Sequence, residues 1–92
     1  MTTSRFQIIR TQPFFDNSLR NLPTAINTEI NKIERVLEID PFLIAKPLRA
    51  PLQGRYAIRI LGRKYRIICR IDIHTHRVYL DYVRPRSTAY LL

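Results

Sequence analysis

The spacing of apolar residues changes once along this chain, and this change constrains the fold more than any other feature. In residues 23–39, Ile26, Ile30, Ile33 and Leu37 recur every three or four positions, which places them in one stripe along a helix. After residue 54 apolar and polar residues alternate instead, as they do in strands with one buried face. The sequence therefore predicts a helical part followed by a sheet-forming part.

The sheet-forming part divides into three segments. They are rich in Ile, Tyr and Val, and short turns at Gly62 and around His74 separate them. They predict an antiparallel meander of three strands, at residues 55–61, 64–72 and 77–83.

The first half of the chain predicts a strand and two helices. Residues 6–10 form the expected strand, and residues 13–21 form a short helix that makes a hairpin with the helix at 23–39. Three prolines in residues 41–54 predict an extended connector. The predicted fold is a single α+β domain, residues 1–92, with an N-terminal strand, a two-helix hairpin and the meander, and its helices cover one face of the sheet.

Alternation along the strands predicts that one face of the sheet is apolar and the other basic. The face toward the helices should carry Tyr56, Ile58, Ile60, Tyr65, Ile67, Cys69, Ile71, Val78, Leu80 and Tyr82. The opposite face should carry Ala57, Arg59, Leu61, Arg66, Ile68, Arg70, Arg77, Tyr79, Asp81 and Val83. Arg84, Arg86 and Tyr90 follow in the tail and are expected at the edge of the basic face.

The charge distribution agrees with a basic face in the second half of the chain. Residues 1–45 contain five Lys and Arg and five acids, whereas residues 46–92 contain eleven Lys and Arg and two acids. The second half thus carries the whole net charge of +9. Concentrated positive charge of this kind attracts a polyanion, and arginines beside tyrosines suit the phosphates and bases of nucleic acid.

Several classes of protein do not fit the composition. Two glycines, Gly54 and Gly62, are too few for a P-loop or a G-x-G-x-x-G fingerprint, so no nucleotide cofactor is expected. The single cysteine, Cys69, is expected in the core with a raised thiol pKa, and it suits a reducing cytoplasm.

Asp72, His74 and His76 resemble part of a metal site, but residues of these types occur more often in a turn, and we predict no metal. No segment is long and apolar enough to cross a membrane, so the chain is expected to be soluble and cytoplasmic.

The order of elements and two motifs resemble the RelE/ParE superfamily of bacterial type II toxins. One motif is the run Tyr-Arg-Ile-Ile that begins at Tyr65, and the other is an arginine six residues before a tyrosine, Arg84 and Tyr90. The resemblance covers nearly the whole chain. For the RelE branch it implies a RelE-like fold, a ribosome-dependent endoribonuclease that cleaves messenger RNA and inhibits translation, and a cognate antitoxin protein as partner.

The resemblance also implies roles for individual residues. Arg66 matches an arginine that contacts the scissile phosphate, and Arg84 matches one that supports it. Tyr90 matches a tyrosine that stacks on a base, and Arg59 matches one of two lysines; the other lysine position is Ala57 here. These four residues, Arg59, Arg66, Arg84 and Tyr90, are the predicted catalytic set. Further contacts with nucleic acid are predicted for Lys64, Arg70, Arg77, Tyr79 and Arg86.

Two other functions fit the same sequence. A ParE-like inhibitor of DNA gyrase has this fold without the arginine and tyrosine requirement. A catalytically inactive relative that binds nucleic acid is also open, because Ala57 stands where the family has a lysine. The predicted partners are the antitoxin, the ribosome and messenger RNA, with no membrane.

Overall fold

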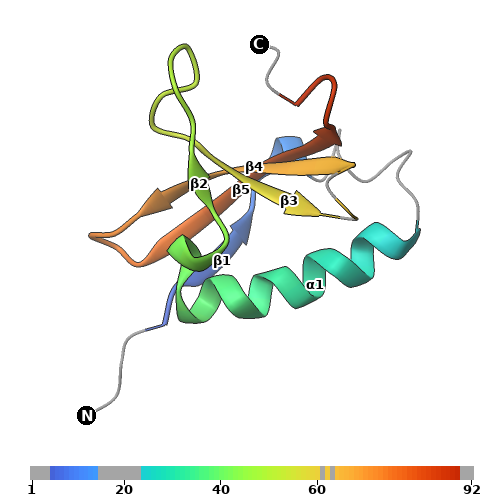
Figure 1. The fold of residues 1–92 in the computed structure, drawn as a ribbon. Coiled ribbons are helices and arrows are strands. Elements are labelled where there is room, and N and C mark those ends of the chain that lie inside the picture. The colour runs from blue at the N-terminus through green and yellow to red at the C-terminus, as the bar shows by residue number, and fades with distance from the viewer. Residues whose placement is uncertain (1–4, 15–23, 61, 63, 90–92) are drawn as a thin grey trace.

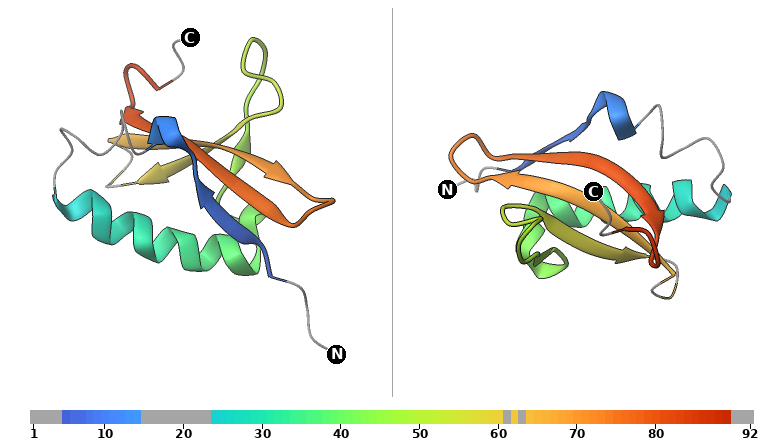
Figure 2. Two further views of the ribbon diagram at one scale, coloured as in Figure 1. Left: turned by 180° about the vertical axis from the view of Figure 1, so that it is seen from behind. Right: turned by 90° about the horizontal axis from the view of Figure 1, so that it is seen from above.

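A single sheet organises the part of the chain that the structure, a computed structural model, describes: residues 5–14, 24–60, 62 and 64–89. Its five strands run in the spatial order β1-β5-β4-β3-β2. They are β1 (Gln7–Arg10), β2 (Lys46–Pro47), β3 (Tyr56–Ile60), β4 (Tyr65–Asp72) and β5 (Arg77–Pro85). The helix α1 (Thr24–Ile39) crosses one face of this sheet (Figures 1 and 2).

The α+β class predicted from the sequence is confirmed, but the sheet is larger and mixed. Strands β3, β4 and β5 pair antiparallel in succession, while β1 pairs with β5 in parallel at the edge of the sheet. The predicted helix at residues 13–21 lies, beyond Phe14, outside the described residues. The described part of the chain therefore shows α1 and not the hairpin of two helices.

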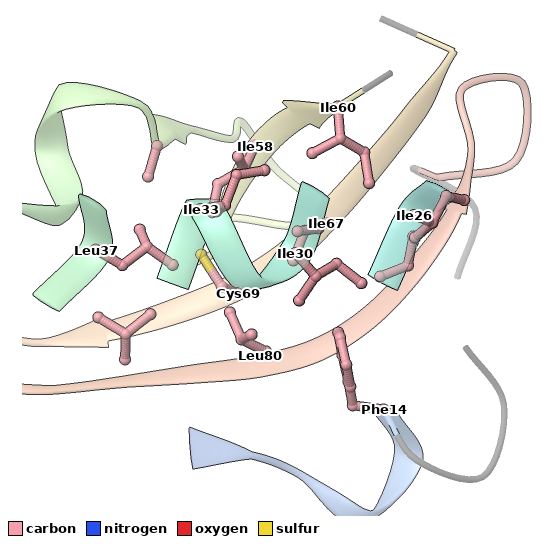
Figure 3. Close-up of a cluster of buried hydrophobic side chains, with 13 residues drawn as sticks. Phe14, Ile26, Ile30, Ile33, Leu37, Ile58, Ile60, Ile67, Cys69 and Leu80 are labelled. Carbon is pink, nitrogen blue, oxygen red and sulfur yellow. The ribbon is translucent and has the colours of Figure 1, made fainter. Parts of the chain in front are cut away.

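Helix α1 forms as its apolar stripe predicts. Ile26, Ile30, Ile33 and Leu37 are all buried against the sheet. They pack with residues from β3, β4 and β5, including Ile58, Ile60, Ile67, Cys69 and Leu80 (Figure 3). Burial of these side chains removes apolar surface from water, which is the main stabilising contribution to a fold of this size. Phe14, which follows β1, is also buried in this cluster.

The prediction of an extended connector at residues 41–54 is wrong for its first residues. A 3₁₀ turn, η2 (Pro41–Leu43), follows α1 directly. The Asp40 side chain accepts a hydrogen bond from the amide of Phe42, and Pro41 brings a backbone angle that suits a first helical position. The chain then forms β2, where Lys46 pairs with Ala57 and Pro47 with Tyr56. Because β2 has two residues and ends in a proline, it lacks the alternation that marks a strand in a sequence.

The predicted assignment of faces is wrong for the second half of β5. The register with β4 shifts between Ile68 and Cys69, so that Ile68 pairs with Tyr82 and Cys69 with Leu80, and Asp81 is left over as a β-bulge. One extra residue exchanges the two faces of the strand beyond it. Val83 therefore joins the helix-side core, and Tyr82 lies on the opposite face with Arg84.

The turn between β4 and β5 holds Asp72, His74 and His76 by hydrogen bonds and stacking. Asp72 Oδ1 accepts hydrogen bonds from the amides of His74 and Thr75, at 3.0 and 3.3 Å. Hydrogen bonds from Thr75 lower the pKa of Asp72, and the one from the Thr75 side chain has the largest effect. The His76 ring stacks on Phe6 at 4.5 Å. Among the residues that the structure describes, no group of three or more His, Cys, Asp or Glu side chains is placed to hold a metal ion.

Cys69 lies fully buried in the core, as predicted, and it should be unreactive in the native protein. Burial, with a smaller effect of the Asp81 charge, raises the pKa of its thiol to about 12. The thiolate is the reactive form, so we expect iodoacetamide at pH 8 to label Cys69 only after unfolding in urea. Because an unfolded thiol loses its proton near pH 8.5 and the folded one does not, this group should lower the stability as pH rises from about 9 to 12. Rapid labelling of the native protein at pH 8 would contradict the buried placement.

No helix among the described residues is both long and apolar enough to span a bilayer.

Candidate functional site

Three arginines lie side by side on the face of the sheet opposite α1, which we call the open face. In the strand register Arg59 on β3 is opposite Arg66 on β4, and Arg66 is opposite Arg84 on β5. Side chains of directly opposed residues project from the same face, with Cβ atoms about 5 Å apart. We call Arg59, Arg66 and Arg84 the arginine row.

The three side chains of the arginine row differ in how far they are buried. Arg66, in the centre, is 5% exposed, while Arg59 is exposed and Arg84 is half-buried. A guanidinium nitrogen of Arg66 donates a hydrogen bond to the Tyr65 carbonyl at 3.1 Å, and the Arg84 guanidinium lies 4.5 Å from the centre of the Tyr82 ring. Like charges directly opposite each other across strands destabilise a sheet. Three of them in one row indicate a surface suited to binding an anion.

Two segments rise beside the arginine row on the open face. The loop between β2 and β3 and residues 86–89, which follow β5, both lie on the side of the sheet away from α1 (Figures 1 and 2). The Tyr82 hydroxyl donates a hydrogen bond to the Ala89 carbonyl at 3.1 Å, which ties the chain after β5 to the sheet. Leu52, Ala57, Ile68 and Ala89 are buried yet lie outside the helix-side core. The open face is therefore partly covered, and the arginine row is held in a fixed setting.

The other predicted nucleic-acid contacts fall into three places. Lys64 and Arg86 are exposed at the same end of the sheet as the arginine row, joined by a 2.8 Å hydrogen bond from the Arg86 amide to the Lys64 carbonyl. Arg77 pairs with Asp72 at the opposite end of β4, about 20 Å from Arg66 at the usual rise of a strand. The structure thus separates Arg77 from the arginine row.

Arg70 and Tyr79 form a separate cluster in the middle of the open face. Arg70 donates two hydrogen bonds to the Asp81 carboxylate, at 2.8 and 2.9 Å, and its guanidinium lies 4.9 Å from the centre of the Tyr79 ring. The Asp81 hydrogen bond raises the pKa of Arg70. Asp81 therefore neutralises Arg70, and the β-bulge that carries Asp81 also places Arg84 in the row.

Two further residues complete the comparison with the sequence. Tyr90 lies outside the described residues. Lys46 was not among the predicted site residues, but its pairing with Ala57 puts it on the open face near Arg59. A two-residue edge strand gives no periodic pattern, so sequence reasoning had no signal for this lysine.

One of three comparisons with known proteins finds a match, and it is a match of the fold. No family model and no curated protein matches the sequence. Among solved structures, the chain is similar to a chain of the toxin–antitoxin complex RelBE2 from Mycobacterium tuberculosis, with a TM-score of 0.77 and 26% sequence identity. The match covers 89% of this chain and 99% of that chain. This structural match confirms the resemblance to RelE-like toxins.

Proposed function

We propose that this protein is the toxin of a type II toxin–antitoxin system and that it is a ribosome-dependent endoribonuclease acting on messenger RNA. The observation that carries the proposal is the arginine row, three guanidinium groups in register on the open face. The similarity to a chain of a toxin–antitoxin complex supports the toxin class. The location that we propose is the cytoplasm, because the proposed target is the ribosome with its message.

The chemistry that suits the arginine row is attack of an RNA 2′-hydroxyl on the adjacent phosphate. A bond forms between the 2′-oxygen and phosphorus, the bond from phosphorus to the 5′-oxygen breaks, and a 2′,3′-cyclic phosphate remains. In the transition state, negative charge develops on the phosphate oxygens. Positive groups that are already fixed in place stabilise this charge. Arg66 and Arg84 suit this role, because a guanidinium binds phosphate through two parallel hydrogen bonds.

Proton transfer needs a second group, because an arginine is not deprotonated near neutral pH. Ala57 cannot take part, and Tyr79 lies beside Arg70, about 13 Å along β4 from Arg66. We propose that Tyr90, which the resemblance places at the attacking hydroxyl, or a group of the ribosome accepts the 2′-hydroxyl proton and returns one to the leaving 5′-oxygen. Most of the catalysis by this chain is then electrostatic stabilisation and positioning.

Expression of the protein in bacteria tests the proposal against inhibition of DNA gyrase. We expect growth arrest accompanied by new 5′ ends inside coding regions, mapped by sequencing of cellular RNA. Growth arrest with intact messages and an induced DNA-damage response would favour the ParE-like function instead. The arginine row favours the ribonuclease, since gyrase inhibition does not call for it.

Release of Arg70 from its ion pair should strengthen binding of RNA. We expect Asp81→Asn to increase the affinity for a single-stranded oligoribonucleotide about threefold at 0.1 M salt and to steepen the salt dependence by about 0.7 in log–log slope, because one more cation faces the phosphates. The stability should change by about 1 kcal/mol or less, since the Arg70 side chain is 50% exposed, although that of Asp81 is only 15% exposed. Fluorescence anisotropy measures the affinity.

Glu34→Gln is the matched control for that substitution. It makes the same change in net charge but releases Arg10, whose ion pair with Glu34 at 2.8 Å joins β1 to α1 on the other face. Equal tightening by both variants would show that the overall charge, and not the open face, governs binding.

A further inference from the structure

The Tyr82 side chain contacts two parts of the candidate site at once. The Arg84 guanidinium lies over its ring, 4.5 Å from the ring centre. The hydroxyl, at the far end of the same side chain, donates a hydrogen bond to the Ala89 carbonyl at 3.1 Å. One half-buried side chain therefore joins the arginine row to the segment that leads to Tyr90.

The segment after β5 is buried only at its last described residue. Residues 86–88 are exposed, whereas Ala89 is fully buried. The Thr88 amide donates a hydrogen bond to the Pro85 carbonyl at 3.0 Å, which closes a turn but does not join Ala89 to the sheet. The hydrogen bond from Tyr82 makes that connection. Because a buried carbonyl without a donor is costly, loss of this hydroxyl favours opening of the segment to water.

The β-bulge at Asp81 allows Tyr82 to make both contacts. Without the extra residue, alternation would place Tyr82 on the face toward α1, as the sequence predicts. With it, Tyr82 pairs with Ile68 on the open face, and Arg84 follows two positions later on the same face. The bulge thus brings the phenol and the guanidinium together.

We propose that Tyr82 is a positioning residue, which fixes residues 86–89 relative to Arg84. An aromatic face attracts a guanidinium, so the ring holds Arg84 while the hydroxyl holds Ala89. The next residue, Tyr90, is one peptide unit away, so the placement of Ala89 limits the positions open to it. The consequence for catalysis rests on the proposed function. Tyr82 then acts on the cleavage step and not on binding of the message, because it sets the geometry of groups that meet the phosphate.

Hydrogen exchange measured by NMR tests the contact with Ala89 independently of any activity. Tyr82→Phe keeps the ring and removes only the hydroxyl. We expect the Thr88 amide to exchange about fivefold faster in this variant, since one hydrogen bond of ordinary strength opposes opening of the segment by that factor. The Arg86 amide is an internal control. It donates to the Lys64 carbonyl at 2.8 Å, and its exchange should not change.

Single-turnover cleavage on stalled ribosomes, with the protein in excess, tests the consequence for the reaction. We expect Tyr82→Phe to lower the rate at saturation about tenfold, while the protein concentration that gives half the maximal rate changes less than about twofold. Tyr82→Leu also removes the ring beside Arg84, so it should lower the rate at least threefold further. The circular dichroism spectra of both variants should match that of the wild-type protein.

Tyr56→Phe is the matched control. It removes the same hydroxyl from a half-buried tyrosine of the same sheet, but Tyr56 is on β3 and packs against the helix-side core. We expect it to leave the Thr88 exchange and the cleavage rate within about twofold of the wild-type values.

Three results would overturn the inference. Unchanged exchange of the Thr88 amide in Tyr82→Phe would do so whatever reaction the protein catalyses. Equal losses of cleavage rate in Tyr82→Phe and Tyr56→Phe would do so as well. A change in the half-saturating concentration alone would make Tyr82 a binding contact and not a positioning residue. If the wild-type protein cleaves no message while the exchange changes as expected, the proposed function fails and the role of Tyr82 in fixing the segment stands.

Discussion

Arg66→Ala is expected to lower the rate of messenger RNA cleavage by about 100-fold or more, which is the usual loss when one fixed group that stabilises a transition-state oxyanion is removed. Arg66 is the central member of the arginine row, and it is 5% exposed, so its guanidinium is held rigidly. Single-turnover cleavage on stalled ribosomes measures this rate. The fold should survive, since the substitution also removes repulsion from Arg59 and Arg84, its neighbours in the register.

Arg77→Ala is the matched control for that effect. It removes the same charge from the same sheet, but at the far end of β4 from Arg66. We expect it to lower the cleavage rate less than about threefold, through weaker long-range attraction alone. Similar losses in the two variants would mean that total charge, and not the arginine row, determines activity.

Ile30→Ala is expected to have the largest effect on stability. Ile30 is fully buried and lies at the centre of the stripe with which α1 packs on the sheet (Figure 3). Truncation of a buried isoleucine typically costs 2–5 kcal/mol, and we expect about 3 kcal/mol here. A domain of this size has a free energy of unfolding of about 5–15 kcal/mol, so the variant should lose more than about 10 °C in Tm.

Urea denaturation of Ile30→Ala beside Ile73→Ala separates burial from residue type. Ile73 is 57% exposed, and its truncation should change the stability by less than about 0.5 kcal/mol. A loss below about 1 kcal/mol in Ile30→Ala would show that α1 does not pack on the sheet as described.

Periodicity explains what could be predicted from the sequence. The stripe from Ile26 to Leu37 defines α1, and alternation defines β3, β4 and the first half of β5, because in these segments apolar residues face the core and most charged residues face away from it. The same alternation placed Cys69 in the core and Arg66 on the open face, and both placements are confirmed.

Features that break the periodicity could not be predicted. The bulge at Asp81 moves Tyr82 and Val83 to the faces opposite to those expected, because one inserted residue has no counterpart in an alternating pattern. The parallel pairing of β1 with β5 and the edge strand β2 depend on contacts between distant segments. For this reason the position of Lys46 on the open face could not be predicted, and the separation of Arg77 from the arginine row became visible only in the strand register.

Primer extension on a reporter messenger RNA in a purified translation system tests the central claim most directly. Wild-type protein is compared with and without ribosomes on the same message. The proposed function predicts cuts within the codon in the ribosomal A site that appear only when ribosomes are present. An intact message in both reactions, or equal cutting of free RNA, would contradict a ribosome-dependent endoribonuclease.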